Sequence, residues 1–125
     1  MISGIGIDII EIARIRKAIE SNPGFAHRIF SPREIEYCES KADSIVSFAA
    51  RFAAKEAFMK ALGTGWNHEV SWVEIETLTG KNGKPELVIS GRTKATLESR
   101  HITSCHLSLS HEKGYAVANV VLESS

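Results

Sequence analysis

Hydrophobic positions along the chain repeat first with a period of two and then with a helical period. In residues 2–9 the isoleucines Ile5, Ile7 and Ile9 alternate with small or polar residues, which predicts a short buried strand with these isoleucines on one face. Isoleucines at helical spacing then predict a helix over residues 9–20. The chain is therefore expected to open with a strand that leads directly into a helix.

Capping residues predict two further helices. The segment Ser31-Pro32-Arg33-Glu34 combines an N-cap, a proline at the first helical position and a capping-box glutamate, so a short helix should follow to about Cys38. A longer helix is predicted from residue 43 or 44 to residue 62. Gly63 is its expected C-terminal stop, because glycine readily adopts the left-handed conformation of a helix C-cap.

After Gly65 the spacing of hydrophobic residues returns to two. Glycine, asparagine and proline gather between the first two strands of this half, which is typical of a hairpin. The predicted elements are strands at 72–77 and 86–90, a helix at 92–100, and a second hairpin with strands at 106–110 and 115–122. This order of elements predicts an α+β fold, with an antiparallel sheet packed on the long helix in a single domain over residues 1–125.

Composition narrows the classes of function. A chain of 125 residues that is 43% hydrophobic fits one compact core. Fifteen basic and fifteen acidic residues give no net charge, which argues against a nucleic-acid-coating protein. Cys38 and Cys105 lack CxxC spacing, so we expect no disulfide framework and a reducing environment. Without a signal-like start or a membrane-length apolar run, a cytoplasmic protein that has no membrane partner is expected.

Glu56 stands in the apolar stripe of the predicted long helix, among Ile45, Ala49, Phe52 and Met59. An ionised carboxylate removed from water needs a cation, a metal ion or hydrogen-bond donors. Lys60 lies one turn further on, and Lys55 and Arg51 are expected on the adjacent flank. Two interpretations stay open at this point: a wall of a charged site, or a simple Glu56–Lys60 pair at spacing i,i+4.

Asp8 also has two interpretations. Asp8 and Glu11 have the spacing of an N-cap and its capping box at a strand-to-helix junction. Asp8 also follows a Gly-x-Gly strand, whose bare face would let a bulky or phosphorylated group approach the backbone. Mg²⁺ is commonly held by one or two carboxylates together with water and substrate phosphates, so Asp8 and Glu56 would suffice if the fold brings them together.

Other patterns carry less weight. A zinc site on His101, Cys105 and His106 is set aside, because Cys105 and His106 would point to opposite faces of a strand. His111 at a strand end is an ordinary turn residue on spacing alone. A local excess of positive charge lies between residues 11 and 33, and forms either a solvated face or a docking surface for an acidic partner; its basic residues are Arg14, Arg16, Lys17, Arg28 and Arg33.

Three motifs together resemble a known family. They are Gly4-Ile5-Gly6-Ile7-Asp8-Ile9-Ile10-Glu11-Ile12, Arg51-Phe52-Ala53-Ala54-Lys55-Glu56-Ala57 and Ser108-Leu109-Ser110-His111. In this order, and in a chain of this length, they closely resemble the holo-acyl-carrier-protein synthases, the small bacterial type of 4′-phosphopantetheinyl transferase. The resemblance covers essentially the whole chain and implies the fold of that family.

The resemblance implies an enzyme of fatty acid biosynthesis. It would move the 4′-phosphopantetheine arm of coenzyme A to a serine of apo-acyl carrier protein and release adenosine 3′,5′-bisphosphate. Asp8 and Glu56 would bind Mg²⁺, with Glu56 as the base and Lys60 at the diphosphate. Arg51 and His111 would bind the nucleotide phosphates, with His111 nearest the 3′-phosphate. Gly63 and Gly65 would let the backbone come close to coenzyme A.

The resemblance also implies a homotrimer with active sites between subunits. Asp8 and Glu56 of one chain would work with the terminal hairpin of a neighbour, including His111. The acyl carrier protein would dock on Arg14, Arg16, Lys17 and Arg28. Two residues depart from the family pattern. One is Ile7, where the family often has threonine or valine; the other is Glu112, which would affect hydrogen bonding around the 3′-phosphate.

Two rival functions fit parts of the same pattern. Asp8 and Glu56 with Mg²⁺ could activate water in a phosphodiesterase, although a nuclease would ordinarily carry more carboxylates and a broader basic channel. A non-catalytic oligomeric binding module would instead use Asp8 only as an N-cap and Glu56 only in a salt bridge. Incubation with coenzyme A, Mg²⁺ and apo-carrier protein discriminates among the three.

Overall fold

The structure is a computed structural model that describes residues 1–65, 67 and 69–125. Its elements follow one another as β1 (Ile2–Glu11), α1 (Ile12–Ser21), α2 (Phe25–Ile29), α3 (Pro32–Glu39), α4 (Ser44–Leu62), a short 3₁₀ turn η1 (Trp72–Glu74), β2 (Ile75–Thr79), β3 (Pro85–Ile89), α5 (Gly91–Ser99), β4 (Ile102–Glu112) and β5 (Tyr115–Ser124). None of the described helices has the length and apolar character needed to cross a membrane.

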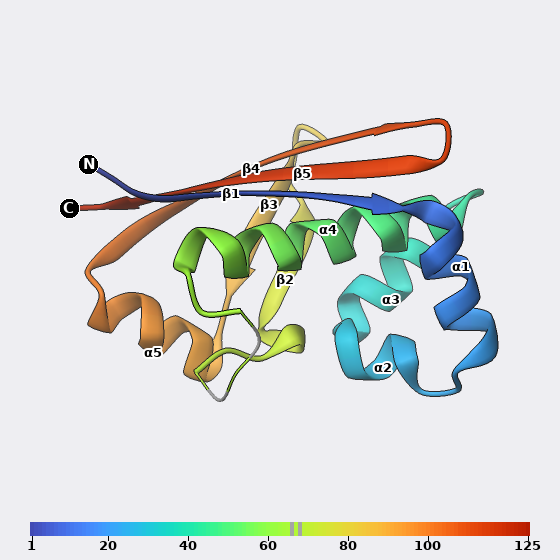
Figure 1. The fold of residues 1–125 in the computed structure, drawn as a ribbon, viewed down its shortest axis with the longest axis horizontal. Helices are drawn as coiled ribbons and strands as arrows, with labels where there is room; N and C mark the ends of the chain where they lie inside the picture. Colours follow the sequence, from blue (N-terminus) through green and yellow to red (C-terminus); the bar gives the residue numbers. More distant parts are fainter. Residues whose placement is uncertain (66, 68) are drawn as a thin grey trace.

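A three-stranded antiparallel sheet lies along the long helix α4 (Figure 1). Its strand order is β1-β5-β4, so the first strand of the chain pairs with the last, and both termini meet at the same end of the sheet. Helices α1, α2 and α3 gather at the N-terminal end of α4, while α5 and the separate β2-β3 hairpin lie toward its other end. The predicted α+β class, with antiparallel strands on one long helix, is confirmed.

The face of β1 that packs inward is the glycine face. A Cβ atom at Gly4 or Gly6 would overlap the backbone carbonyl of Ala61 or Ala57 in α4, so only glycine allows the strand to approach the helix this closely. The prediction that a bulky group approaches these glycines is therefore wrong, because α4 itself occupies that face. The alternating isoleucines Ile5, Ile7 and Ile9 point outward instead.

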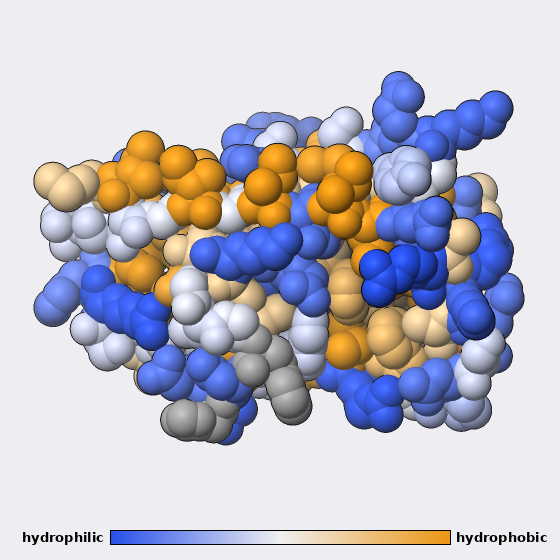
Figure 2. Space-filling view, in the orientation of Figure 1, coloured by the Kyte–Doolittle hydropathy of each residue, from blue (hydrophilic) through white to orange (hydrophobic). Residues whose placement is uncertain are grey.

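These isoleucines are not buried within the chain, contrary to the prediction. Ile5 is 60%, Ile7 59% and Ile9 63% exposed. Figure 2 shows the corresponding row of hydrophobic side chains along the line of β1. Burying apolar side chains is the main favourable term in folding and association, so a continuous exposed row of this kind marks a surface that another chain can cover.

Local capping follows the sequence closely in two helices. In α3 the Ser31 backbone N–H donates to the Glu34 side chain at 3.1 Å, and the Glu34 N–H donates to the Ser31 hydroxyl at 3.2 Å, which confirms the capping box. In α4 the Asp43 side chain accepts a hydrogen bond from the Val46 N–H at 3.3 Å. Gly63 ends α4 with a φ of 82°, as predicted.

The sequence missed α2 and placed several boundaries differently. Helix α2 has only five residues and follows Gly24, whose φ is 89°, so no helical period could reveal it. Strand β1 continues to Glu11, and α1 begins at Ile12 rather than near residue 9. Residues 72–74 form the turn η1 rather than a strand, and β4 begins well before residue 106, at Ile102.

Candidate active site

The structure brings Asp8, Glu56 and Lys60 together where β1 runs beside α4. The Lys60 ammonium donates to Asp8 Oδ1 at 3.0 Å and to the Ile7 carbonyl at 3.2 Å. The Lys60 side chain is 55% exposed and the Asp8 side chain 13% exposed, so the ion pair lies at the edge of the protein. The second oxygen of Asp8, Oδ2, is buried and has no hydrogen-bond partner among the described residues. An acceptor without a donor in such a place is well suited to a cation.

Glu56 lies beside this pair and is half-buried. Burial raises the pKa of its carboxyl group, the negative charge of Asp8 raises it further, and Lys60 opposes both effects. The raised pKa of Glu56 shows that the ionised carboxyl group lacks compensating positive charge at this place. A bound divalent cation would supply that charge.

These contacts correct three interpretations from the sequence. Asp8 is not the N-cap of α1, because the strand runs on to Glu11, which caps the helix without a side-chain hydrogen bond. In the described part of the chain, Glu56 forms no ion pair with Lys60, whose partner is Asp8. Glu56 is also not in the centre of the buried stripe, because it is only half-buried and lies one turn before the exposed Lys60.

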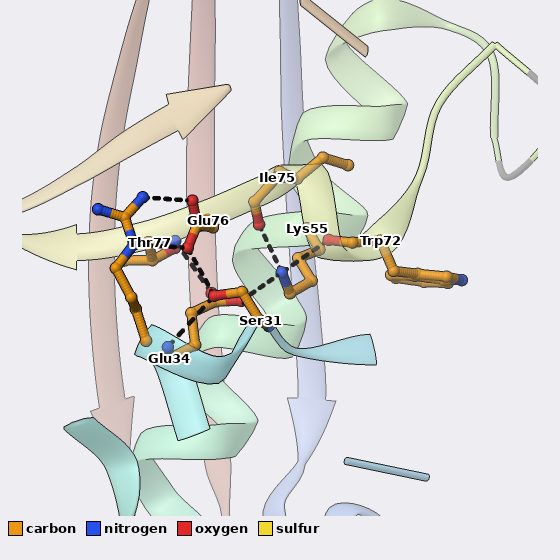
Figure 3. A network of polar contacts seen from close by, with 8 residues as sticks. Ser31, Glu34, Lys55, Trp72, Ile75, Glu76 and Thr77 are labelled. Carbon is orange, nitrogen blue, oxygen red and sulfur yellow. Dashed lines mark hydrogen bonds and ion pairs between the residues drawn. The ribbon is translucent and has the colours of Figure 1, made fainter. Parts of the chain in front are cut away.

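Lys55 does not flank Glu56 but is fully buried on another side of α4. Its ammonium donates to Glu34 Oε1 at 2.7 Å, to the Trp72 carbonyl at 2.8 Å and to the Ile75 carbonyl at 2.5 Å (Figure 3). Burial lowers the pKa of Lys55, and the carboxylate of Glu34 opposes this shift. All three ammonium hydrogens have an acceptor, so Lys55 is a structural group that ties α4 to α3, η1 and β2.

Glu34 and Glu76 complete this polar network (Figure 3). The second oxygen of Glu34 accepts a hydrogen bond from the Thr77 N–H at 3.0 Å, in addition to the capping contact. Glu76 accepts from the Ser31 hydroxyl at 2.6 Å and from the Arg33 guanidinium at 2.7 Å. The sequence indicated Glu34 as a cap only. The signal for the buried pair was a lysine inside an alanine-rich segment of α4.

Arg51 and His111 line a second region, on a cavity of about 380 Å³. Arg51 is only 5% exposed, and its guanidinium carbon lies 4.2 Å from the centre of the Tyr37 ring. In the part of the chain that the structure describes, its Nε has no hydrogen-bond partner. His111 is exposed near the end of β4. The structure therefore brings together the two residues that the resemblance assigns to nucleotide phosphates.

The two regions lie on different sides of α4. Arg51 and Glu56 are five residues apart, which corresponds to about 140° around a helix with 3.6 residues per turn. One chain therefore does not place Arg51 and His111 beside Asp8 and Glu56 in a single pocket. Gly63 and Gly65 both have positive φ, and the described chain leaves open space where a Cβ would lie at either position.

The predicted docking cations are all exposed. Arg14, Arg16 and Lys17 project from α1, and Arg28 projects from α2. Arg28 also lines a cavity of about 760 Å³, together with Trp72 and Arg92. The α1 face and this cavity are both accessible in the single chain.

The donor set around Asp8 fits a hard cation. Among the described residues, no group of three or more His, Cys, Asp or Glu side chains gathers as a metal site. Two carboxylates are enough for Mg²⁺ when water and substrate phosphates supply the other ligands. Two observations support Mg²⁺ binding by this pair: the buried Oδ2 of Asp8 lacks a donor among the described residues, and the pKa of Glu56 is raised.

Comparisons with known proteins identify the family of the chain. The model of the 4′-phosphopantetheinyl transferase superfamily matches residues 4–120. The holo-[acyl-carrier-protein] synthase of Geobacter sp. (strain M21) is 49% identical over 124 residues, which are 98% of this chain and 99% of that protein.

Two solved structures have the same fold. The holo-[acyl-carrier-protein] synthase of Neisseria meningitidis superposes with a TM-score of 0.92 at 38% identity, over 99% of this chain and 100% of that one. The enzyme from Bacillus anthracis in complex with CoA (3′,5′-ADP) superposes with a TM-score of 0.84 at 43% identity, over 100% and 99%. The chain therefore belongs to the 4′-phosphopantetheinyl transferase superfamily, among the holo-[acyl-carrier-protein] synthases, which confirms the enzyme class that its three sequence motifs predict.

Proposed function

We propose that this chain transfers the 4′-phosphopantetheine arm of coenzyme A to a serine of apo-acyl carrier protein in a Mg²⁺-dependent reaction, releasing adenosine 3′,5′-bisphosphate. One observation carries the proposal for this site. Among the described residues, the buried Oδ2 of Asp8 has no hydrogen-bond donor. Beside it, burial and the charge of Asp8 raise the pKa of Glu56, so the pair is incomplete without a cation. The complexes of family members with coenzyme A support the same donor substrate.

Asp8 and Glu56 would hold the Mg²⁺. When bound, the ion would neutralise charge on the diphosphate of coenzyme A as the phosphoanhydride bond breaks. Lys60 reaches the same place from the next turn of α4, so its ammonium can bind the diphosphate as well as Asp8. The acidic pair and the lysine together suit a substrate that carries adjacent phosphates.

Glu56 is the proposed base. The serine oxygen of the carrier attacks the phosphorus that bears the pantetheine arm, and the bond from that phosphorus to the nucleotide-side oxygen breaks, leaving its electron pair on adenosine 3′,5′-bisphosphate. The serine proton passes to Glu56, directly or through water. A raised pKa favours this role, because a general base works best when its pKa lies close to the working pH.

The nucleotide would bind at Arg51 and His111 of a neighbouring chain. These residues share a cavity that lies on a different side of α4 from Asp8 and Glu56, so a site that uses both groups needs two subunits. The exposed row of Ile5, Ile7 and Ile9 supplies an apolar surface for that association. We propose a homotrimer, in which each interface forms one active site.

The acyl carrier protein would dock on the cationic face of α1 and α2. This face is exposed and offers complementary charge to an acidic partner; its cations are Arg14, Arg16, Lys17 and Arg28. Within this proposal the reaction takes place in the cytoplasm as part of fatty acid biosynthesis.

The direct test incubates the protein with coenzyme A, Mg²⁺ and apo-carrier protein and then determines the mass of the carrier. We expect a gain equal to one phosphopantetheine arm, and no gain when the ion is chelated. Nucleic acid cleaved under the same conditions would support a phosphodiesterase. A carrier of unchanged mass, with no other reaction, would support a binding module.

Complementation tests the shared site. Glu56→Gln and His111→Ala chains should each be inactive, but trimers mixed after reversible dissociation should contain interfaces where an intact Glu56 meets an intact His111. We expect partial recovery of arm transfer, with sedimentation as a check on assembly. A fully active monomer, or stable mixed trimers without recovery, would contradict the shared site.

A further inference from the structure

The ring of Tyr37, in α3, lies close to two cations, Arg51 and Lys41. The Arg51 guanidinium carbon lies 4.2 Å from the ring centre and the Lys41 ammonium 4.7 Å from it. Both distances are within the range of cation–π attraction, in which the negative face of an aromatic ring stabilises a positive charge. Tyr37 and Arg51 both line the cavity of about 380 Å³.

Arg51 is a buried charge without a carboxylate. It is 5% exposed, its Nε has no hydrogen-bond partner, and within the described residues it has no ion-pair partner within 4.0 Å. A buried guanidinium normally needs an anion. The Tyr37 ring stabilises the cation but does not neutralise it, so the positive charge remains available to an external anion.

The other groups around the cavity match an anionic ligand. The hydroxyls of Ser47, Thr79 and Ser110 line it, as does His111, and none of the lining residues described is acidic. The pKa of Tyr37 is lowered mainly by the Thr79 side chain, with added contributions from the charges of Arg51 and Lys41. The phenol and the two cations are therefore electrostatically coupled.

We propose that Tyr37 is a positioning residue that determines phosphate specificity: its ring holds Arg51 and Lys41 so that they recognise the 3′-phosphate of the nucleotide donor. This inference rests on the proposed function, because it assigns the 3′-phosphate to the Arg51 cavity. The ring itself need not touch the ligand. It keeps the guanidinium in one orientation and keeps a second, exposed cation, Lys41, 4.7 Å from the centre of a ring that lines the cavity.

The test compares two nucleotides that differ only in the phosphate at issue. Calorimetry with adenosine 3′,5′-bisphosphate and with adenosine 5′-phosphate gives the affinity contributed by the 3′-phosphate. For Tyr37→Leu we expect the dissociation constant of the bisphosphate to rise about 5- to 20-fold, the range of one or two lost cation–π contacts, with little change for the monophosphate. Tyr37→Phe keeps the ring and should restore most of the difference.

Lys41→Gln tests the same claim without altering the ring. It should reduce the preference for the bisphosphate by a smaller factor, about 2- to 5-fold, because Lys41 is exposed and screened. Lys94→Gln, an exposed lysine on α5, is the matched control and should change neither affinity. Melting curves confirm that each variant is folded.

The outcomes separate this inference from the proposed function. Equal weakening of both nucleotides by Tyr37→Leu, or unchanged binding in both Tyr37→Leu and Lys41→Gln, would overturn the role of Tyr37. A wild-type chain that transfers the arm but shows no preference for the bisphosphate would also overturn it, while leaving the proposed function intact. Failure of the wild-type chain to modify any apo-carrier would instead contradict the proposed function.

Discussion

Helix α4 carries two charged clusters that differ in how completely they are satisfied. Lys55 and Glu34 have side chains that are 0% exposed, and both oxygens of Glu34 and all three ammonium hydrogens of Lys55 have partners. At Asp8 and Glu56, one oxygen of Asp8 is buried without a donor among the described residues, and burial together with the charge of Asp8 raises the pKa of Glu56. Only the second cluster can gain from a ligand.

The difference shows how one helix can serve structure and function. A fully paired buried charge fixes neighbouring elements, because any rearrangement would leave a charge without a partner in a poorly polarisable interior. An incompletely paired cluster at the surface can bind an external cation or phosphate without breaking the fold. Adjacent residues of one motif, Lys55 and Glu56, therefore have opposite roles.

The largest expected effect comes from removing the charge of Lys55. Lys55→Met should lower the free energy of unfolding by about 3–5 kcal/mol, because Glu34 would remain buried without its cation. Chemical denaturation followed by circular dichroism measures this loss. The matched control is Lys60→Met on the same helix, where an ion pair at the surface should contribute less than about 1 kcal/mol.

A double variant sharpens this result. Glu34→Gln in the Lys55→Met background removes the stranded charge while keeping a side-chain acceptor, so it should recover part of the lost stability. If Lys60→Met destabilised the protein as much as Lys55→Met, the distinction between the two clusters would be wrong.

The incompletely paired cluster of Asp8 and Glu56, the open cluster, should behave in the opposite way: its variants should lose activity rather than stability. Asp8→Asn and Glu56→Gln should each reduce arm transfer at least about 100-fold, because charge stabilisation by a bound ion supplies several kcal/mol. The melting temperature of Glu56→Gln without metal should equal or exceed that of the wild-type chain, because the change removes repulsion between two acids, whereas Asp8→Asn also removes the ion pair with Lys60. Transfer assays in saturating Mg²⁺ and thermal melts test both halves. Near wild-type rates in both variants would exclude the proposed metal site.

Sequence patterns predicted the parts of the fold that depend on local chemistry. Ser31, Glu34 and Gly63 act through their own backbone neighbourhood, so their capping roles could be read from spacing. Asp8 has the spacing of a cap as well, yet β1 continues past it because the strand pairs with β5 as far as Glu11. That pairing joins the two ends of the chain, and no local signal contains it.

The candidate site shows the same limit. Two of the motifs contain Asp8 and Glu56, helical spacing added Lys60, and the fold brings the three together. Spacing could not tell which lysine of α4 is buried, because Lys55 is stabilised by Glu34 and by carbonyls from the distant segment 72–75. Nor could alternation in β1 show which face is buried, since either face of a strand can pack inward.

Reversing the charge of one exposed cation should have a moderate effect on KM for the carrier protein and little effect on KM for coenzyme A. Arg14→Glu should raise KM for the acyl carrier protein about 5- to 10-fold and leave KM for coenzyme A nearly unchanged, because an exposed charge acts mainly on encounter with a partner. The effect should shrink at high salt. Steady-state kinetics with each substrate varied in turn measures it, and Lys94→Glu is the control. Equal changes in both KM values would count against docking on α1.

The smallest effect concerns the pH dependence of the open cluster without metal. Since burial and Asp8 raise the pKa of Glu56 above its ordinary 4.5, the folded chain holds this proton more tightly than the unfolded chain. Glu56 therefore destabilises the fold increasingly as pH rises from 4.5 through the raised pKa, and its effect is constant above it. Glu56→Gln removes that trend, so its melting temperature should exceed the wild-type value by a margin that grows over this pH window.

Adding Mg²⁺ should shrink this margin in melting temperature, because the ion stabilises the ionised carboxylate in the wild-type chain alone. Glu20→Gln, at an exposed position of α1, controls for the loss of one carboxylate. A margin that narrowed with rising pH would mean that Glu56 has a paired, stabilising role like that of Glu34, and the contrast between the two clusters would fail.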